Sequence, residues 1–327
     1  MSGQTVLVIG GAGFIGSNLI DRLRSDDPGM EIRVFDNFSS GQLWHIEKHL
    51  KSPRFCLIEG EAKDTESLLA AMNGVDTVIH LASNPDIARA AVEPDIDFWS
   101  GSALTQSVLE AMRRSNAKVI LYVSGSGVYG DLGEEEGVED RISLRPVSPY
   151  AASKIAGEAM VSAYIDMFGM RGATFRFGNV VGPRQTHGVG FDFLRALRRD
   201  PRRLRILGDG QQSKSYIHVD DVTEAVLTVS RQLGAGQYSV FNVATGDYIT
   251  VEEIARIAVG VMGLDPAAVK FELTGGRAGW KGDVPVVRLN TDRIRSLGWA
   301  NRLNARQAIE SAMRSLLGDA DRVFKAA

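Results

Sequence analysis

The chain has 327 residues, of which 44% are hydrophobic and 24% are charged, and its formal net charge is -3. This composition is typical of a soluble globular protein with one large domain or two ordinary ones, and it offers no general attraction to nucleic acid or to a membrane surface. No apolar stretch is long enough to span a membrane. The single cysteine, Cys56, excludes an intrachain disulfide and suits a reducing cytoplasm.

Continuous apolar runs predict strands in the first half of the chain. These runs are 5–9, 31–35, 55–58, 76–81, 118–123 and 173–177. Because they lack polar alternation, we expect each strand, including the one that holds Cys56, to be buried on both faces of a parallel sheet. The intervening segments carry apolar residues at helical spacing, as over 18–24, 66–72 and 103–113. Right-handed crossovers would then give a Rossmann-type, doubly wound α/β sheet.

After about residue 180 the sequence changes to a mixture of short strands, loops and helices. Strands are predicted at 206–207 and 240–243, and helices over 251–262 and 305–316. We therefore expect a larger domain over 1–180, with a later segment near 206–245 returning to it. A smaller α/β lobe is expected over 181–327.

A glycine-rich loop joins the first predicted strand to the first predicted helix. Gly10, Gly13 and Gly16 have the spacing that permits a tight turn, a close approach of the backbone to a pyrophosphate, and close packing of the helix on the sheet. The helix N-terminus supplies N–H donors and the positive end of the helix dipole. The strand before the loop and the helix after it favour a dinucleotide site.

The second predicted strand ends at Asp36, which lies 20 residues after Gly16. A carboxylate at this point can accept both ribose hydroxyls of an adenosine, and it would repel a 2′-phosphate. No Arg or Lys follows immediately. The sequence therefore favours NAD over NADP as the cofactor.

Tyr150 and Lys154 are four residues apart in a segment that we expect to be helical, so their side chains share one face. A phenol ordinarily titrates near pH ~10, and a neighbouring cation lowers its pKa by favouring the phenolate. The pair is a candidate general base for the oxidation of an alcohol. The spacing is also common on exposed helices, and the dinucleotide site is what favours the catalytic interpretation.

Other polar groups are expected to be structural. His45 and His49 have helical spacing but no third ligand near them, so we predict a solvent-facing pair and no metal site. The arginines between 195 and 205 have no interleaved aromatic residues, which favours a solvated surface over nucleic-acid binding. The acidic residues of 134–140 are expected to form a solvated loop.

Taken together, the motifs resemble the extended short-chain dehydrogenase/reductase family, and within it the nucleotide-sugar epimerase/dehydratase branch. The resemblance rests on the glycine loop, Asp36-Asn37-Phe38-Ser39-Ser40-Gly41, His80-Leu81-Ala82, Val128-Tyr129-Gly130, the Tyr150/Lys154 pair, and the segments 176–184 and 208–219. In overall pattern the chain is most similar to the UDP-glucose 4-epimerases.

The resemblance implies NAD as the cofactor, a nucleotide sugar as the substrate in a cleft between the lobes, and a homodimer formed through the helices near 103–114 and 150–168. The implied cofactor residues are Gly10, Gly13, Phe14, Ile15, Gly16, Asp36, Asn37, Ser39, Ser40, Gly41, Glu61, Ala62, Leu81, Ala82, Ser83, Tyr150, Lys154 and Phe177. The implied substrate residues are Ser126, Asn179, Arg184, Lys214, Tyr216, Arg277 and Asp283.

Several substrate residues have alternative interpretations. Arg184, Arg277 and Asp283 fit surface ion pairs as well as they fit substrate contacts. Lys214 stands where many members of the family have Arg, which grips phosphate in a bidentate way, whereas Lys supplies a point charge.

By the mechanism of the family, Tyr150 would remove the proton from a sugar hydroxyl, usually O4, while the adjacent carbon gives a hydride to NAD. Lys154 would hold the nicotinamide ribose and lower the pKa of Tyr150. In an epimerase, the 4-keto sugar then turns over and takes the hydride back on its other face.

Two glycines depart from the family pattern. Members usually carry Ser or Thr at position 125, where its hydroxyl bonds O4, but this chain has Gly125. Ser126 or Ser124 can take that role if the glycines let the loop shift, a water molecule can bridge the gap, or the reaction can differ. Of these we predict Ser126. Gly101 stands where an Asn is common. The two glycines are also compatible with room for a bulkier substrate group.

Positions 126 and 127 bear on the reaction. Dehydratases of the family typically carry an Asp-Glu pair there and decarboxylating relatives keep a Glu, whereas this chain has Ser126 and Gly127. The sequence therefore favours an isomerase, an NAD-dependent 4-epimerase of a UDP-linked hexose. The alternatives are a lyase, either a dehydratase or a UDP-glucuronate decarboxylase, and an NAD-binding regulatory protein with an impaired site.

Overall fold

The computed structural model describes residues 3–234 and 237–324, and the chain forms two compact units. The first unit comprises the residues up to Val128, Ser148–Arg176 and Thr223–Phe241. The second comprises Tyr129–Val147, Phe177–Val222 and the residues from Asn242 on. The segment that returns to the first unit is thus Thr223–Phe241, and the second unit takes up an early segment, Tyr129–Val147.

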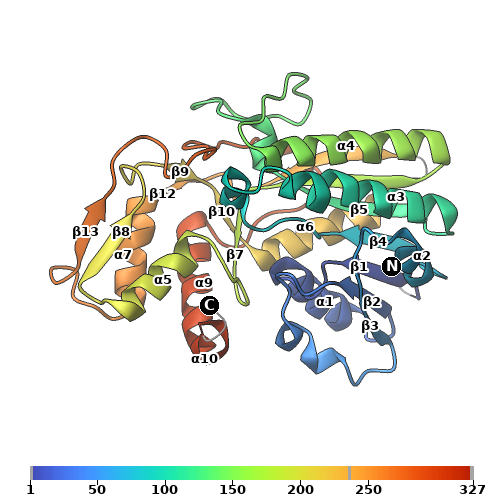
Figure 1. Ribbon diagram of the computed structural model, residues 1–327, viewed down its shortest axis with the longest axis horizontal. Helices are drawn as coiled ribbons and strands as arrows, with labels where there is room; N and C mark the ends of the chain where they lie inside the picture. Colours follow the sequence, from blue (N-terminus) through green and yellow to red (C-terminus); the bar gives the residue numbers. More distant parts are fainter. Residues whose placement is uncertain (1–2, 235–236, 325–327) are drawn as a thin grey trace. The chain divides into compact units, whose positions relative to one another are not determined.

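A seven-stranded sheet forms the centre of the first unit (Figure 1). Its strands are β1 (Thr5–Ile9), β2 (Glu31–Asp36), β3 (Phe55–Glu59), β4 (Thr77–His80), β5 (Val119–Gly125), β6 (Arg171–Phe177) and β11 (Tyr238–Val243). Their order is β11-β6-β5-β4-β1-β2-β3. Strand β1 pairs in parallel with β2 on one side and with β4 on the other. The chain order reverses between β1 and β4, and such a switch point is where open α/β sheets bind ligands.

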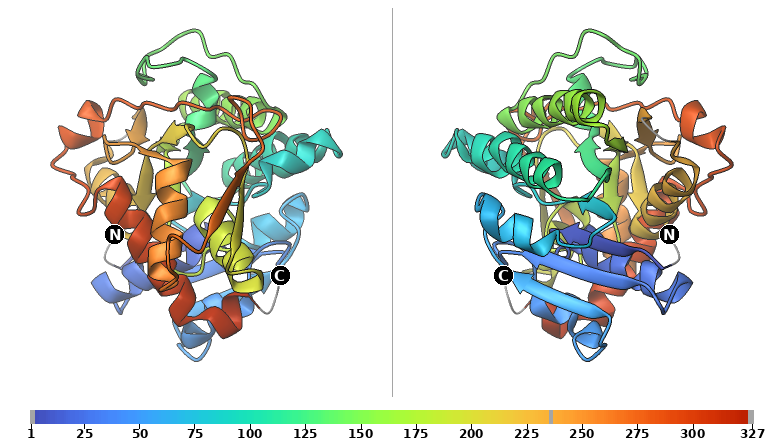
Figure 2. Two further views of the ribbon diagram at one scale, coloured as in Figure 1. Left: turned by 90° about the vertical axis from the view of Figure 1, so that its left-hand side faces the viewer. Right: turned by 90° about the vertical axis from the view of Figure 1, so that its right-hand side faces the viewer.

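Helices cover both faces of the sheet, which confirms the predicted doubly wound fold. The helices of this part of the chain are α1 (Phe14–Asp26), α2 (Thr65–Ala71), α3 (Leu104–Arg114), α4 (Pro149–Phe168) and α6 (Val219–Gln232). The core under α2, α3 and α4 includes Phe35, whereas Val34 lies on the opposite face beside Ile20 of α1. Helices α3 and α4 lie side by side (Figure 1, Figure 2).

Strand β3 corrects one expectation, because Cys56 is exposed rather than buried. In this strand only Phe55 is buried. The reason is topological: β3 is the last strand of the sheet, so it has a neighbour on one side only. An apolar run predicts a strand but does not tell whether that strand lies at the edge.

The second unit consists of short paired strands and helices. Its helices are α5 (Val189–Arg199), α7 (Val251–Val261), α8 (Asp292–Arg295), α9 (Ala305–Gly318) and α10 (Ala320–Val323). The parallel pairs are β7 (Asn179–Val181) with β10 (Tyr216–His218) and β8 (Arg203–Ile206) with β13 (Lys270–Leu273). Strand β9 (Ser213–Lys214) pairs antiparallel with β12 (Ile249–Thr250). Of the predicted strand 206–207, only Ile206 lies in a strand.

Among the described residues, no helix combines the length and the apolar character that a membrane crossing requires.

Candidate active site

The loop after β1 has the backbone geometry that a dinucleotide phosphate requires. Gly10 has a left-handed φ of 82°, and a Cβ on it would lie 2.8 Å from the backbone nitrogen of Ala82. A Cβ on Gly16 would lie 2.5 Å from the carbonyl oxygen of Gly10. Gly13 is the N-cap of α1 and has no side chain to bond the first N–H groups of the helix. These N–H groups therefore suit an anionic ligand.

Asp36 lies at the end of β2 and is buried. Its Oδ2 accepts a hydrogen bond from the Ala12 N–H at 2.9 Å, and its Oδ1 accepts one from the Phe38 N–H at 2.9 Å. Burial raises the pKa of Asp36, and the two backbone hydrogen bonds oppose this shift. Each carboxylate oxygen can accept a further hydrogen bond, as two ribose hydroxyls require. Gly41 lies against the carboxylate, because a Cβ there would be 2.8 Å from Oδ1. The loop and Asp36 thus fit NAD.

Other residues expected at the cofactor gather at the same edge of the sheet. Asn37 donates to Glu61 Oε1 at 3.2 Å. The N–H groups of Leu81 and Ala82 both donate to the Ile9 carbonyl, at 3.0 and 3.1 Å. The segment after β4 is therefore held against the glycine loop. Phe177, also expected at the cofactor, is buried in the second unit.

The prediction of a solvent-facing histidine pair is wrong. His45 is buried, and its Nδ1 lies 2.7 Å from the carbonyl oxygen of Ala12. His49 Nε2 lies 2.7 Å from Asp21 Oδ1. The two residues belong to separate 3-10 turns, Leu43–His45 and Glu47–His49, so the helical spacing does not apply. His45 instead contacts the backbone of the glycine loop at Ala12.

Helix α4 brings Tyr150 and Lys154 to one face, as predicted. The Ser148 side chain caps the helix by accepting the Ala151 N–H, which places Tyr150 in the first turn. Lys154 is buried, and its Nζ donates to the Val123 carbonyl at 2.9 Å. The Lys154 Nζ lies 5.5 Å from the centroid of the Tyr150 ring. The pair is thus fixed at the carboxyl end of β5.

The expected lowering of the Tyr150 pKa is wrong for this structure. Loss of hydration raises the pKa of Tyr150 to about 12, a hydrogen bond with the Ser83 side chain opposes the shift, and the negative charge of Asp97 adds to it. Burial lowers the pKa of Lys154 to about 8. The ammonium group is directed at a carbonyl and is itself desolvated, and it is not among the groups that shift the pKa of Tyr150.

The region of Gly125 leaves space beside Tyr150. A Cβ on Gly125 would have the Tyr150 phenol oxygen as its nearest neighbour, at 3.9 Å, so there is space for a side chain beside Tyr150. Ser124 is buried, and Ser126 is half-buried at the start of the 3-10 turn Ser126–Tyr129.

Gly101 does not make room for a larger substrate. It lies in a π-helical segment, Phe98–Ala103, and a Cβ on it would be 2.5 Å from Ser153 Oγ. Ser153 occupies the space that a side chain at position 101 would need. The space expected from the two glycines therefore exists at Gly125 alone.

Asn84 and Asp97 are buried residues of the site that the sequence did not indicate. Asn84 Nδ2 donates to Asp97 Oδ1 at 2.9 Å and to the Asp86 carbonyl at 2.9 Å. Burial raises the pKa of Asp97, while the Asn84 hydrogen bond and then the positive charge of Lys154 oppose this. Both residues lie in segments without helical or strand periodicity. The one feature of the sequence that could have indicated a site residue is the position of Asn84, shortly after His80-Leu81-Ala82.

His80 is buried behind Lys154, and its Nε2 lies 3.1 Å from Thr105 Oγ1. Burial, followed by the positive charge of Lys154, lowers the pKa of His80 from 6.5 to about 3. Between these values the unfolded chain binds a proton that the folded chain does not, so stability falls as the pH falls.

We expect His80 to cost the protein about 2 kcal/mol of unfolding free energy between about pH 6.5 and pH 5. In His80→Gln this part of the acid sensitivity should vanish, whereas His49→Gln, which retains His80, should keep it. Urea unfolding at both pH values measures the difference. Equal acid sensitivity in the wild type and in His80→Gln would show that His80 is not the responsible group.

The second unit brings together three of the predicted substrate residues. Lys214 Nζ lies 2.6 Å from Asp283 Oδ1, and Asp283 Oδ2 accepts the Gly279 N–H at 3.0 Å. Tyr216 is buried, which raises its pKa, and the negative charge of Asp283 contributes to the shift. Lys214 is therefore held in place by a buried carboxylate.

Of the remaining predicted substrate residues, Asn179 adjoins this group, because it is the partner of Tyr216 in the β7–β10 register. Arg277 is exposed and lies 3.5 Å from Asp131 in a surface ion pair, which is its alternative interpretation. Asn179 Nδ2 donates to the Ser215 carbonyl at 3.3 Å. Arg184 is half-buried with a left-handed φ of 67°.

The acidic segment 134–140 is not simply solvated. Glu139 is buried and accepts the Asn242 N–H at 2.9 Å. Glu134 lies 3.1 Å from Arg288, and Asp140 lies 2.5 Å from Arg293. These partners come from distant parts of the chain, which a local charge pattern does not indicate.

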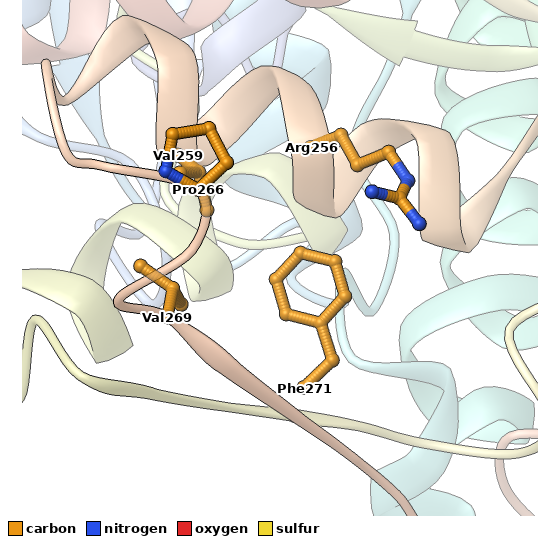
Figure 3. Close-up of a pocket in the computed structure, with 5 residues that line it drawn as sticks. All are labelled: Arg256, Val259, Pro266, Val269 and Phe271. Carbon is orange, nitrogen blue, oxygen red and sulfur yellow. The ribbon is translucent and has the colours of Figure 1, made fainter.

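A separate hollow of about 320 Å³ lies between α7 and β13 in the second unit (Figure 3). It is lined by Arg256, Val259, Pro266, Val269 and Phe271. Arg256 is its only charged residue, and the guanidinium is bound to Glu252 at 2.6 Å. The lining offers no acid, base or nucleophile, so we do not assign it to the candidate site.

Comparisons with known proteins agree with this geometry. A profile of the NAD dependent epimerase/dehydratase family matches residues 6–244. The UDP-glucose 4-epimerase of Mycolicibacterium smegmatis is 33% identical over 301 residues, which cover 90% of this chain and 92% of that protein. A crystal structure of UDP-galactose 4-epimerase has a TM-score of 0.85 and 33% identity, covering 97% of this chain and 99% of that one.

A dehydratase is also similar in structure. The dTDP-glucose 4,6-dehydratase of Streptomyces venezuelae, solved as a double mutant with NAD, has a TM-score of 0.88 and 25% identity. The match covers 98% of this chain and 99% of that one. Because epimerases and dehydratases are both similar, the chemistry of the site must distinguish the two reactions.

Proposed function

This chain belongs to the NAD-dependent epimerase/dehydratase family, and from that premise we propose that it epimerises a UDP-linked hexose at C4 through a transient 4-keto sugar. Membership confirms the resemblance expected from the motifs, and it confirms NAD as the cofactor. The observation that carries the proposal is the Tyr150/Lys154 pair at the end of β5, in a chain that has Ser126 and Gly127 where dehydratases carry acids.

Each group has a defined part in this proposal. When bound, NAD accepts a hydride from C4 of the sugar and later returns it. Tyr150 exchanges a proton with O4, and this requires its phenolate. Lys154 keeps a positive charge at neutral pH, because its pKa is about 8. We propose that the first unit binds NAD and that the second unit binds the sugar nucleotide, with Lys214 at the diphosphate.

A second candidate is the elimination of water from a nucleotide sugar. This reaction needs an acid or base in addition to Tyr150. Asp97 favours it, because Asp97 is a buried carboxyl group whose charge acts on both Tyr150 and Lys154. Epimerisation remains the first proposal, since it needs no further acid.

The experiment that tests the function is incubation of the purified protein with UDP-glucose, UDP-galactose, UDP-GlcNAc and UDP-glucuronate, followed by NMR of the sugar protons. Interconversion of a C4 pair supports the epimerase. Loss of water or of carbon dioxide contradicts it and supports a lyase. Retention of NAD without any turnover supports the regulatory alternative.

We also propose that the chain forms a homodimer through α3 and α4. Helix α4 buries its two central charged residues, Lys154 and Glu158, while its exposed positions include Ala159, Ala163 and Met167. A helix that is apolar on its outer face as well as its inner face usually packs on both sides.

We expect Ala159→Arg to convert the dimer into a monomer, because a charge would be buried without a partner. Sedimentation velocity measures the change. Ala267→Arg places the same charge on an exposed position of the second unit and should leave the dimer intact. An unchanged sedimentation coefficient for Ala159→Arg would exclude this face.

A further inference from the structure

Helix α4 buries a second charged residue one turn after Lys154. Glu158 lies four residues further along the helix, so the two side chains share the face that packs on the sheet. The Arg176 guanidinium of β6 binds the Glu158 carboxylate through two nitrogens: Nε lies 3.0 Å from Oε1, and Nη2 lies 2.6 Å from Oε2. Only 5% of the Arg176 side chain and 8% of the Glu158 side chain are exposed. The carboxylate is therefore held in one orientation.

A buried ion pair is by itself a weak source of stability, because removing two charges from water costs about as much as their attraction returns. Lys154 gives this pair a further purpose. Its ammonium is buried, and its hydrogen bond goes to the neutral carbonyl of Val123 at 2.9 Å. A buried cation without a negative group nearby tends to lose its proton. A fixed carboxylate one turn away on the same helix supplies that negative charge.

Aromatic rings surround Lys154 on its other sides. The ring centroids of Tyr150 and Tyr122 lie 5.5 and 5.4 Å from the Lys154 Nζ, and burial raises the pKa of both phenols. His80 of β4 is buried as well, and this burial, followed by the charge of Lys154, lowers its pKa to about 3. The negative charge that balances Lys154 therefore has to come from a carboxyl group.

Two buried carboxyl groups meet this need, Glu158 and Asp97. Burial lowers the pKa of Lys154 to about 8, and the charges of Glu158 and then of Asp97 oppose this shift. Asp97 is bound by the neutral amide of Asn84 at 2.9 Å, and burial raises its own pKa. Glu158 is bound by Arg176 instead, and a guanidinium is always charged in proteins. Of the two groups, Glu158 is the one that a cation holds in place.

We propose that Glu158 and Arg176 are positioning residues, whose ion pair fixes a negative charge beside Lys154 and so keeps its ammonium charged for catalysis. This inference rests on the proposed function, in which the charged Lys154 acts beside Tyr150. The two residues act through Lys154 and not on the substrate.

Glu158→Gln tests the charge, because it keeps the size of the side chain. Since the reaction needs the charged form of Lys154, kcat falls as the pH rises through the Lys154 pKa. In Glu158→Gln this alkaline limb of the kcat profile should move down by about one pH unit, so that kcat at about pH 9 falls about 10-fold. Glu158→Asp keeps the charge and should leave the limb within about 0.3 pH units of the wild type.

A second variant removes both charges. Removing one partner of a buried ion pair strongly destabilises a protein, whereas neutral replacement of both partners is tolerated. Glu158→Gln combined with Arg176→Met should therefore fold even if Glu158→Gln alone does not, and it should move the alkaline limb in the same direction. Tyr238→Phe is the control. It removes a hydroxyl 3.4 Å from the Glu158 carbonyl and changes no charge beside Lys154, so the limb should stay in place.

A measurement without substrate separates this inference from the proposed function. NMR of lysine labelled at Cε follows the protonation of Lys154 in the NAD-saturated protein, and Lys154→Met identifies its signal. The Lys154 pKa should be lower in the two charge-removing variants than in the wild type.

An unchanged Lys154 pKa in the charge-removing variants would overturn the inference. So would a kcat that falls equally at every pH, since a purely structural role predicts that result. If the wild type converts none of the four sugars while the Lys154 pKa still falls in the variants, the proposed function is wrong and the effect of the ion pair on Lys154 stands.

Discussion

Tyr150→Phe is expected to lower kcat by at least about 10³-fold, toward complete loss of turnover, while the affinity for NAD stays within about 3-fold of the wild type. The substitution removes one oxygen, and that oxygen is the proposed acceptor of the O4 proton. The aromatic ring remains in the first turn of α4, so the helix and the glycine loop keep their geometry. NMR of the sugar products and titration with NAD measure the two quantities.

Tyr164→Phe is the matched control for this prediction. It removes a phenol oxygen from the same helix, where Tyr164 Oη accepts a hydrogen bond from Gln106 at 2.6 Å. Its turnover should remain close to that of the wild type. If Tyr150→Phe keeps more than about a tenth of the wild-type kcat, another group must be the base, and the buried acid Asp97 would be the first to examine.

Gly10→Ala is expected to weaken NAD binding by more than about 10²-fold and to destabilise the fold. Two effects act together. A left-handed φ costs a non-glycine residue about 1–2 kcal/mol. In addition, the new Cβ would lie 2.8 Å from the Ala82 backbone nitrogen, and backbone atoms held by the Ile9 carbonyl cannot move away cheaply. Urea unfolding and NAD titration measure the outcome.

Gly74→Ala separates the two effects. Gly74 also has a left-handed φ, of 71°, but a Cβ there would meet nothing within 4 Å. It should show only the backbone strain and should bind NAD normally. Equal loss of stability and equal NAD affinity in the two variants would show that crowding against Ala82 does not matter.

Local patterns were sufficient for the sheet and the cofactor loop. The apolar runs at 5–9 and 31–35 are followed directly by Gly10 and Asp36. A strand and the residue that follows it are neighbours in the sequence, so both can be recognised from it. The helical spacing of Tyr150 and Lys154 likewise needed only that 149–168 be a helix. Such features can be predicted from the sequence because they depend on residues that are only a few positions apart in the chain.

Features that depend on distant contacts could not be predicted in this way. Cys56 is exposed because β3 is at the edge of the sheet, and His45 is buried because it reaches the carbonyl of Ala12. The Asn84–Asp97 hydrogen bond joins two loops with no periodic pattern. Each of these features depends on which distant segments of the chain come into contact. A local sequence pattern does not specify those contacts.

The sequence by itself determined the Rossmann-type sheet, the glycine loop, NAD and the placement of Tyr150 with Lys154 on one helix face. The tertiary structure decided how burial shifts the pKa values of that pair and where space lies beside it. A pKa depends on hydration and on charges brought from other segments, so only the folded chain shows that burial raises the pKa of Tyr150. Likewise, only the folded chain shows that a side chain has space beside Tyr150 at position 125, whereas Ser153 fills the corresponding space at position 101.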